Sequence, residues 1–325
     1  MTPVLAHGVG SVQDLPVPQW LFLYGAAVVL VVSFLALALL WRRPVLERET
    51  RRPLPEALQR TVVSPVLRAA LGTLGFALLV LVMATALLGE RSAATNIAPT
   101  FVYVAFWLGL VPFVVLLGNV WAWLNPWRAA ADALAAVSRT LGGGSEPFPY
   151  PSRLGRWPAA AGLFAFASLE LAWHDPADPR HLALAVFVYS GIQWIGSLVF
   201  GRRAWFENGE AFSVYFWLLS RVAPLDLRRR DGGCELVARP PLVGLAVLRD
   251  PRPGTIAFVA VMLGSVGFDG FSRTSVWQDL LVGRGELERT ALNLAGLLAA
   301  VLAVALAYAL AILAVRSLTG SRAAL

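Results

Sequence analysis

Seven long blocks of apolar residues with almost no charge dominate this chain. A helix that rises about 1.5 Å per residue needs about 20 apolar residues to cross a hydrocarbon core of about 30 Å. The blocks approach that length and cover residues 20–41, 69–89, 101–124, 157–173, 182–201, 254–271 and 290–315. Only 14% of all residues are charged, against about 25% in soluble domains. We therefore expect an all-α, polytopic integral membrane bundle with about seven transmembrane helices.

The arginines predict how these spans are oriented. All 27 basic residues are arginine, and cytoplasmic loops retain positive charge. With the N terminus outside and the C terminus cytoplasmic, 22 arginines lie inside and 5 lie outside. The net charge of +7 is then a signal of topology, so nucleic-acid binding is excluded. We expect a multi-pass protein of the bacterial plasma (inner) membrane, surrounded by lipid, that handles a small molecule and has a possible partner subunit in the membrane.

Two segments outside the spans complete the predicted topology. Residues 1–19 form an external tail, and its first ten residues resemble the end of a signal peptide whose start lies upstream. Either the true start lies upstream, or the tail is short and external, and both interpretations place His7 outside. Residues 204–253 are predicted to be cytoplasmic, with an interfacial or partly re-entrant helix followed by a small hairpin around a DG turn. This hairpin is too short to be a catalytic domain.

A group of histidines and carboxylates is predicted at the outer surface. Glu170 and His174 are four residues apart and share a helical face, while His181 opens the next span after the sequence DPADPR. Imidazoles with carboxylates suit zinc, iron or copper, so a metal site of His7, His174, Asp175 and His181 is one hypothesis. Glu170 would then orient His174. The alternative is an ordinary solvated loop in which aspartates cap a helix.

Asp269 is a second candidate, because charged side chains in membrane spans are costly and often functional. It stands near the outer end of a predicted span in the sequence GSVGFDGFSRTSVW, where glycines would let the helix unwind. Arg273 follows one helical turn later, so a simple ion pair is the alternative. Glu170 and Asp269 are the two candidate catalytic carboxylates.

Asn125 precedes a proline and stands among tryptophans at the predicted inner interface. We expect Glu207, Asn208 and Glu210 to face it from the other half of the chain. Such a cluster suits a cation or a polar headgroup, whereas interfacial tryptophans beside a helix break need no ligand. The fifth predicted span contains three further side chains with polar groups, Ser190, Gln193 and Trp194. We expect them either to line a cavity or to join helices by hydrogen bonds.

Four stretches of the sequence resemble a family of bacterial polytopic membrane proteins commonly labelled fenitrothion hydrolase. They are AHGVGSVQDLPVPQWLFLYGAA, NPWR, FENGEAF and GSVGFDGFSRTSVW, and the resemblance runs from His7 to the last span. It implies a membrane-embedded hydrolase that cleaves an organophosphorus triester. It carries over no catalytic residues, so the outer histidines are the metal candidate on chemical grounds alone.

The preferred hypothesis is therefore a membrane-embedded hydrolase of organophosphorus-type esters, in which one divalent transition metal generates hydroxide for attack at phosphorus. A membrane transporter or a metal-handling permease component is the alternative, favoured by predicted helix breaks around Asp269 and Asn125. A non-catalytic subunit of a membrane complex is the third hypothesis.

Overall fold

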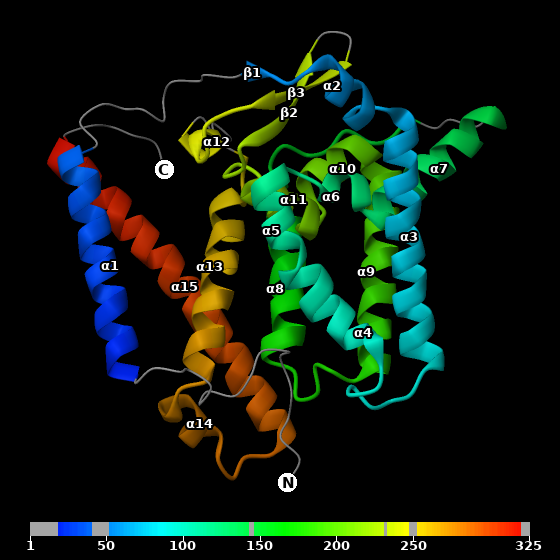
Figure 1. Ribbon diagram of the computed structural model, residues 1–325. Coiled ribbons are helices and arrows are strands. Elements are labelled where there is room, and N and C mark those ends of the chain that lie inside the picture. Colours follow the sequence, from blue (N-terminus) through cyan, green and yellow to red (C-terminus); the bar gives the residue numbers. More distant parts are fainter. Residues whose placement is uncertain (1–18, 41–51, 143–145, 231–232, 247–251, 320–325) are drawn as a thin grey trace. The chain divides into compact units, whose positions relative to one another are not determined.

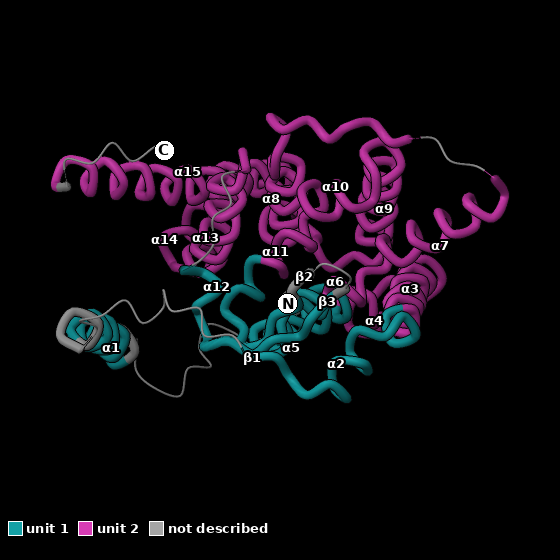
Figure 2. Tube along the Cα trace, turned by 90° about the horizontal axis from the view of Figure 1, so that it is seen from above, with its two compact units in different colours: residues 1–68, 100–120, 218–249 teal, residues 69–99, 121–217, 250–325 magenta. Residues whose placement is uncertain are grey.

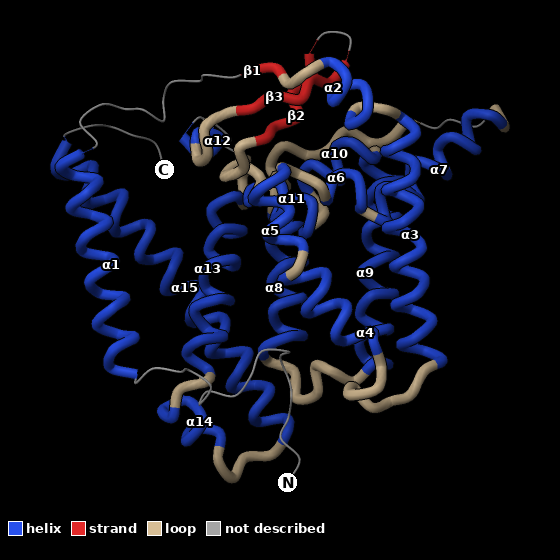
Figure 3. Tube along the Cα trace, in the orientation of Figure 1, coloured by secondary structure: helices blue, strands red, loops and turns tan. Residues whose placement is uncertain are grey.

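The structure, a computed structural model, describes residues 19–40, 52–142, 146–230, 233–246 and 252–319. The chain is mostly helical, as predicted, and the described residues also form one small sheet (Figures 1 and 3). Two compact units are distinguished (Figure 2). Unit 1 comprises residues 1–68, 100–120 and 218–249, and unit 2 comprises residues 69–99, 121–217 and 250–325.

Unit 1 combines irregular apolar helices with the sheet. Its elements are α1 (Gln19–Leu40), β1 (Arg52–Pro53), α2 (Glu56–Val62), η2 (Phe101–Leu108), α5 (Leu110–Leu117), β2 (Leu225–Arg230), β3 (Gly233–Ala238) and α12 (Val243–Ala246). The predicted hairpin is confirmed as antiparallel strands β2 and β3, and β1 pairs with the other edge of β3. The buried Arg239 fixes the end of β3, because its guanidinium donates to Asp226 Oδ2 at 2.7 Å and to the carbonyl of Ser220 at 2.8 Å.

The predicted third span is interrupted. Residues 101–108 form a π-helical stretch, and the amide of Gly109 donates to the carbonyl of Val104 at 2.7 Å. The sequence predicts a kink at Pro112. In the structure Pro112 lies in the first turn of α5, where its missing N–H breaks no helical hydrogen bond. The irregular turn thus stands just before the proline. α5 ends at Leu117, short of the predicted boundary at residue 124.

Unit 2 is a helical bundle. Its longer helices are α3 (Pro65–Leu88, which begins in unit 1), α7 (Pro126–Thr140), α8 (Trp157–Leu171), α9 (Pro179–Phe200), α13 (Thr255–Ser272) and α15 (Glu286–Thr319). The shorter ones are α4 (Ile97–Thr100), α6 (Trp121–Leu124), α10 (Arg202–Asn208), α11 (Ala211–Leu219) and α14 (Ser275–Leu281), and both α4 and α11 end in unit 1. α8 and α13 begin at the end of unit 2 where α9 finishes, and they end where α9 begins (Figure 1).

Small residues let the helices of unit 2 approach closely, as in other membrane bundles. α13 packs against both α8 and α15, and a Cβ atom at Gly264 would lie 2.7 Å from the Cα atom of Val301. The buried centre of this packing joins Ala167, Phe268 and Leu297, one residue from each helix. α13 continues without a break through Asp269, so the predicted unwinding at this position is not observed.

Within the described part of the chain, five helices are long and apolar enough to cross a membrane. They cover Pro65–Leu88, Ile97–Leu117, Pro179–Phe200, Thr255–Ser272 and Glu286–Leu318. The two other predicted spans correspond to α1, which is apolar through Tyr24–Leu35, and to the shorter apolar helix Trp157–Leu171. These findings are consistent with a multi-pass membrane protein in a lipid bilayer.

The predicted interfacial helix after residue 204 consists of two helices. α10 ends at Asn208 and α11 begins at Ala211, with Gly209 and Glu210 between them. In α11, Phe212, Val214 and Phe216 are almost completely buried. These side chains of α11 therefore pack inside the protein.

Candidate functional site

The mouth of the α8–α9 hairpin brings two predicted site residues together. The rings of His174 and His181 lie 6.5 Å apart between centroids, and the indole of Trp173 lies 5.0 Å from the first and 6.2 Å from the second. Trp173 and His174 are exposed, and His181 is half-exposed. Both imidazoles are therefore accessible at one end of unit 2.

Asp178 shapes this mouth by starting α9. Its carboxylate accepts hydrogen bonds from the backbone amides of Arg180 at 2.8 Å and His181 at 2.9 Å, and Pro179 occupies the first helical position. The His181 amide, followed by that of Arg180, holds the pKa of Asp178 below its usual value, while partial burial opposes this. The same carboxylate lies 3.8 Å from His181 Nδ1 and pairs with it when the imidazole is protonated. The capping role of the alternative interpretation is thus confirmed.

The two candidate catalytic carboxylates approach each other at this end of unit 2. Glu170 is half-buried near the end of α8, and the charge of Asp269 on α13 acts on it. Asp269 is half-exposed, and its Oδ1 lies 3.8 Å from Arg273 Nε, which is the predicted ion pair. Glu170 also acts electrostatically on Tyr215 of α11. Residues chosen from separate parts of the sequence therefore lie in one electrostatic neighbourhood.

The described residues supply only part of the predicted metal site. Among the residues that the structure describes, no three histidine, cysteine, aspartate or glutamate side chains are grouped so that they could hold a metal ion. His7 lies outside these residues, and Asp175 is exposed in the loop. A common ion with ligand distances of about 2.0–2.1 Å would require the rings of His174 and His181 to move closer together. The described residues therefore do not form a complete metal site.

A second cluster surrounds Glu210, which is completely buried. Its carboxylate accepts hydrogen bonds from the amides of Phe212 at 2.9 Å and Ser213 at 2.7 Å, so it caps α11. Asn125 Nδ2 donates to it at 2.9 Å, and the hydroxyl of Tyr189 makes a further short hydrogen bond. The expectation that Glu210 faces Asn125 is confirmed.

Asn125 is itself a helix cap, and it marks the predicted break. Its side-chain oxygen accepts from the amide of Arg128 at 2.9 Å, with Pro126 at the first position of α7. The N-terminus of α11, which carries partial positive charge, is directed at the Glu210 carboxylate, and Asn125 links the start of α7 to the same carboxylate. This arrangement explains how a carboxylate is accommodated in the interior of the bundle.

The tryptophans beside this cluster join helices. Trp127 Nε1 donates to Ser190 Oγ at 2.8 Å, and Trp205 Nε1 donates to Gln193 Oε1 at 2.8 Å. Ser190 and Gln193 thus act as hydrogen-bond partners between helices, one of the two roles predicted for them. Of the other residues expected to face Asn125, Glu207 pairs with Arg203, and Asn208 accepts a hydrogen bond from Arg252.

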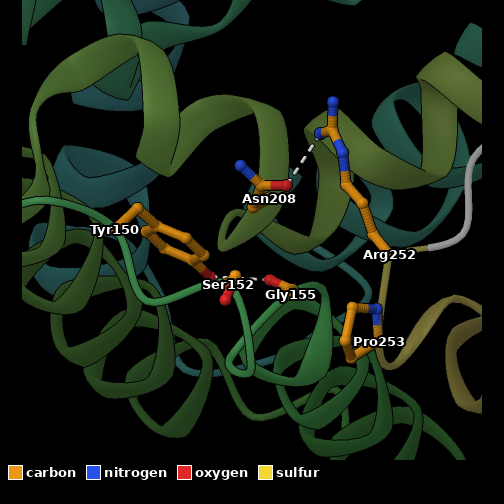
Figure 4. A pocket seen from close by; sticks show the side chains of 6 residues that line it. All are labelled: Tyr150, Ser152, Gly155, Asn208, Arg252 and Pro253. Carbon is orange, nitrogen blue, oxygen red and sulfur yellow. Dashed lines mark hydrogen bonds between the residues drawn. The ribbon is translucent and has the colours of Figure 1, made fainter.

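Two features were not anticipated from the sequence. The first is the hydrogen bond from the Tyr189 hydroxyl in α9 to Glu210. A hydroxyl group within an uncharged span was the sequence signal that could have indicated it. A surface pocket of about 360 Å³ is lined by Tyr150, Ser152, Gly155, Asn208, Arg252 and Pro253 (Figure 4). Three separate segments supply this lining, so no local sequence pattern indicates it.

No family model, curated protein or solved structure matches this chain.

Proposed function

We propose that this chain is a seven-span hydrolase of organophosphorus-type esters in the bacterial plasma membrane, with its reaction site at the outer mouth of the α8–α9 hairpin. The observation that supports the site is the proximity of His174 and His181 at the mouth of this hairpin. Glu170, near the end of α8, interacts electrostatically with Asp269. The sequence resemblance to the fenitrothion hydrolase family supports the reaction. The distribution of arginines supports an N terminus outside and a cytoplasmic C terminus.

The chemistry requires a water molecule to attack phosphorus while an ester oxygen leaves. Imidazole is the side chain best suited to accept the proton of that water near neutral pH. In the proposed reaction, one of the two histidines accepts this proton, a P–O bond forms, and the bond to the leaving group breaks. The exposed indole of Trp173 provides an apolar surface for an aryl ester beside the two rings.

The test is phosphotriester turnover by the purified protein in detergent. His174→Ala and His181→Ala are each expected to reduce turnover at least about a hundredfold, the scale of a lost general base. Arg180→Gln is the matched control, because Arg180 is exposed and adjacent to His181. Equal turnover by the histidine variants and the wild-type protein would refute the proposed site.

A bound divalent metal remains a separate proposal that needs His7 as an additional ligand. Elemental analysis of the purified wild-type protein and of His7→Ala tests it directly. We expect about one zinc, copper or iron ion per chain in the wild-type protein and a clear loss in the variant. A metal-free wild-type protein that still turns over phosphotriester would exclude the metal and leave the imidazole mechanism standing.

Transport is the second candidate, supported by the helix breaks at Asn125 and Gly209 around a buried carboxylate. In this alternative the protein moves a small polar solute. Vesicles containing the purified protein would then take up that solute, and Asp269→Asn would abolish this uptake. If neither activity appears unless another protein co-purifies, a role as a subunit of a membrane complex is favoured.

A further inference from the structure

α7 is an amphipathic helix that leaves the bundle of unit 2. Trp127, Leu134 and Leu141, the last of them just after the helix ends, recur every seven residues and therefore share one face. Asp132 and Arg139 are also seven residues apart, and they lie on the opposite face. Figures 1 and 2 both show α7 running sideways beyond the other helices of unit 2.

The apolar face of α7 is covered at its start and largely bare at its end. Trp127 is buried against α9, where its ring lies 4.9 Å from that of Tyr189 and its Nε1 donates to Ser190 Oγ at 2.8 Å. By contrast, Leu134 is 56% exposed and Leu141 is 80% exposed. The described part of the chain thus leaves about two helical turns of this face largely uncovered.

Two contacts with the region of α9 show where the bare face is directed. Ser190, the partner of Trp127, precedes the last residue of α9, Phe200, by ten positions, which is about 15 Å along the axis. Asp132, on the opposite face of α7, pairs with Arg202, which follows the end of α9. α9 is long and apolar enough to cross a membrane. The apolar face of α7 is therefore directed toward the hydrocarbon core, and its polar face is directed toward water.

The chain that follows α7 returns to the bundle at the last turn of α9. The amide of Phe148 donates to the carbonyl of Val199 at 2.8 Å, and the side chain of Phe148 is 71% exposed. Phenylalanine and leucine are typical of apolar faces that enter the membrane–water boundary. This boundary is therefore expected at the height of the last turn of α9.

We propose that the second half of α7 lies in the plane of the membrane surface, with lipid covering its apolar face. Leu134, Val137 and Leu141 enter the region between headgroups and acyl chains to a depth of about 5–10 Å, as in other interfacial amphipathic helices. Arg139 stays in water, and the ion pair of Asp132 with Arg202 fixes the rotation of α7 about its axis. Lipid is the expected partner because the face is directed toward the hydrocarbon core beside a membrane-crossing helix. The proposal requires membrane embedding and is independent of the reaction proposed above.

Spin labels on the two faces of α7 test this arrangement in the full-length protein. Cys234→Ser removes the single native cysteine, and one new cysteine is introduced by Leu134→Cys on the apolar face or by Ala136→Cys on the opposite face. Both positions are exposed. In phospholipid vesicles, electron paramagnetic resonance compares collisions of each label with oxygen, which concentrates in lipid, and with a water-soluble nickel chelate.

We expect oxygen to dominate at residue 134 and the nickel chelate to dominate at residue 136. Equal access of the nickel chelate to both labels would overturn the proposal, because α7 would then be surrounded by water. Protection of the label at residue 134 from both reagents would also overturn it, since another protein or a second copy of this chain would then cover the face.

A charge on the apolar face provides a second test with a matched control. Leu141→Glu places a carboxylate where lipid is expected, which is costly, so nickel access at residue 134 should rise toward the value measured at residue 136. Thr140→Glu introduces the same charge at the neighbouring exposed residue, on the polar side of the helix, and should leave nickel access at residue 134 unchanged. Equal responses to the two glutamates would overturn the assignment of the apolar face to lipid.

Discussion

The cluster around Glu210 and the mouth of the α8–α9 hairpin use similar residue types in opposite ways. Glu210 is completely buried, and hydrogen bonds from both backbone and side chains occupy its carboxylate. At the hairpin mouth, His174 and His181 are accessible and contact each other mainly through ring faces and edges. Both groups lie in unit 2, and α9 contributes to both.

This contrast separates stability from chemistry. A buried carboxylate whose acceptors are occupied has no capacity for a substrate, but its removal leaves several buried donors without partners. Exposed imidazoles contribute little to folding, and they keep their nitrogens available. The most deeply buried charged group is therefore the structural one, and the reactive candidates are found where the packing is loose.

The largest expected effect is that of Glu210→Ala. Asn125, Tyr189 and the amides of Phe212 and Ser213 would lose their common acceptor, at about 2.4 kcal/mol in total if each of these four bonds contributes about 0.6 kcal/mol in a membrane protein. Thermal unfolding followed by tryptophan fluorescence in detergent measures this change. Glu207→Ala removes a partly exposed carboxylate three residues earlier and should change stability by less than about 1 kcal/mol. Equal destabilisation by the two variants would contradict the structural role of Glu210.

A pair of glycines in α9 tests the packing beside that cluster. A Cβ atom at Gly196 would overlap the indole of Trp205, so Gly196→Ala should destabilise the protein by about 2 kcal/mol. Gly191 has no atom within 4 Å of such a Cβ atom, so Gly191→Ala should be neutral or slightly stabilising. The same melting experiment compares them. If Gly191→Ala were the more harmful change, the packing of α9 against α10 would be wrong.

Asp178 gives an intermediate effect with a defined dependence on pH. Asp178→Ala removes the cap of α9 and should cost about 1 kcal/mol. Because the folded protein holds the pKa of Asp178 below its usual value, the carboxylate contributes stability above pH of about 4. This contribution is lost as the pH falls through the lowered folded value.

Melting curves recorded between neutral and acidic pH test the sign. Asp178→Asn retains a capping oxygen but cannot titrate, so the difference from the wild-type protein should shrink as the solution becomes acidic. A difference that grew on acidification would mean that protonated Asp178 caps α9 better than the carboxylate does.

The smallest effect on stability is expected from His174→Ala and His181→Ala. Both side chains are accessible, so each variant should change the free energy of unfolding by less than about 0.5 kcal/mol. The comparison becomes sharpest when melting and phosphotriester turnover are measured on the same preparations. Strong destabilisation by either variant would place the histidines among the structural residues.

Much of the architecture was predictable because the spans are long and uncharged. The sequence also indicated the hairpin of β2 and β3, whose DG turn separates two strand-like runs. β1 was not predicted, since a strand of two residues shows no alternation and pairs with β3 far along the chain. The interruption before Pro112 was expected as a kink, but a π-helical stretch leaves no pattern in the sequence.

The candidate sites were predictable to different degrees. The contact of Asn125 with Glu210 was expected because both follow predicted spans at the same interface. The short connection between the fourth and fifth predicted spans likewise placed His174 and His181 at one hairpin mouth. The neighbourhood of Glu170 and Asp269 depends on how α8 packs against α13, which spacing within a single helix cannot specify. The pocket around Arg252 requires three segments to meet, so it follows only from the folded chain.

The hydrogen bond between Asn125 and Glu210 has a consequence for biosynthesis. The two residues are 85 positions apart, so at about 5–20 residues per second the ribosome adds Glu210 roughly 4 to 17 seconds after Asn125. During that interval the amide of Asn125 lacks its final acceptor. Until the α10–α11 segment is synthesised, the Asn125 amide can bond only to water or to other groups, so this link between the two parts of the bundle forms late.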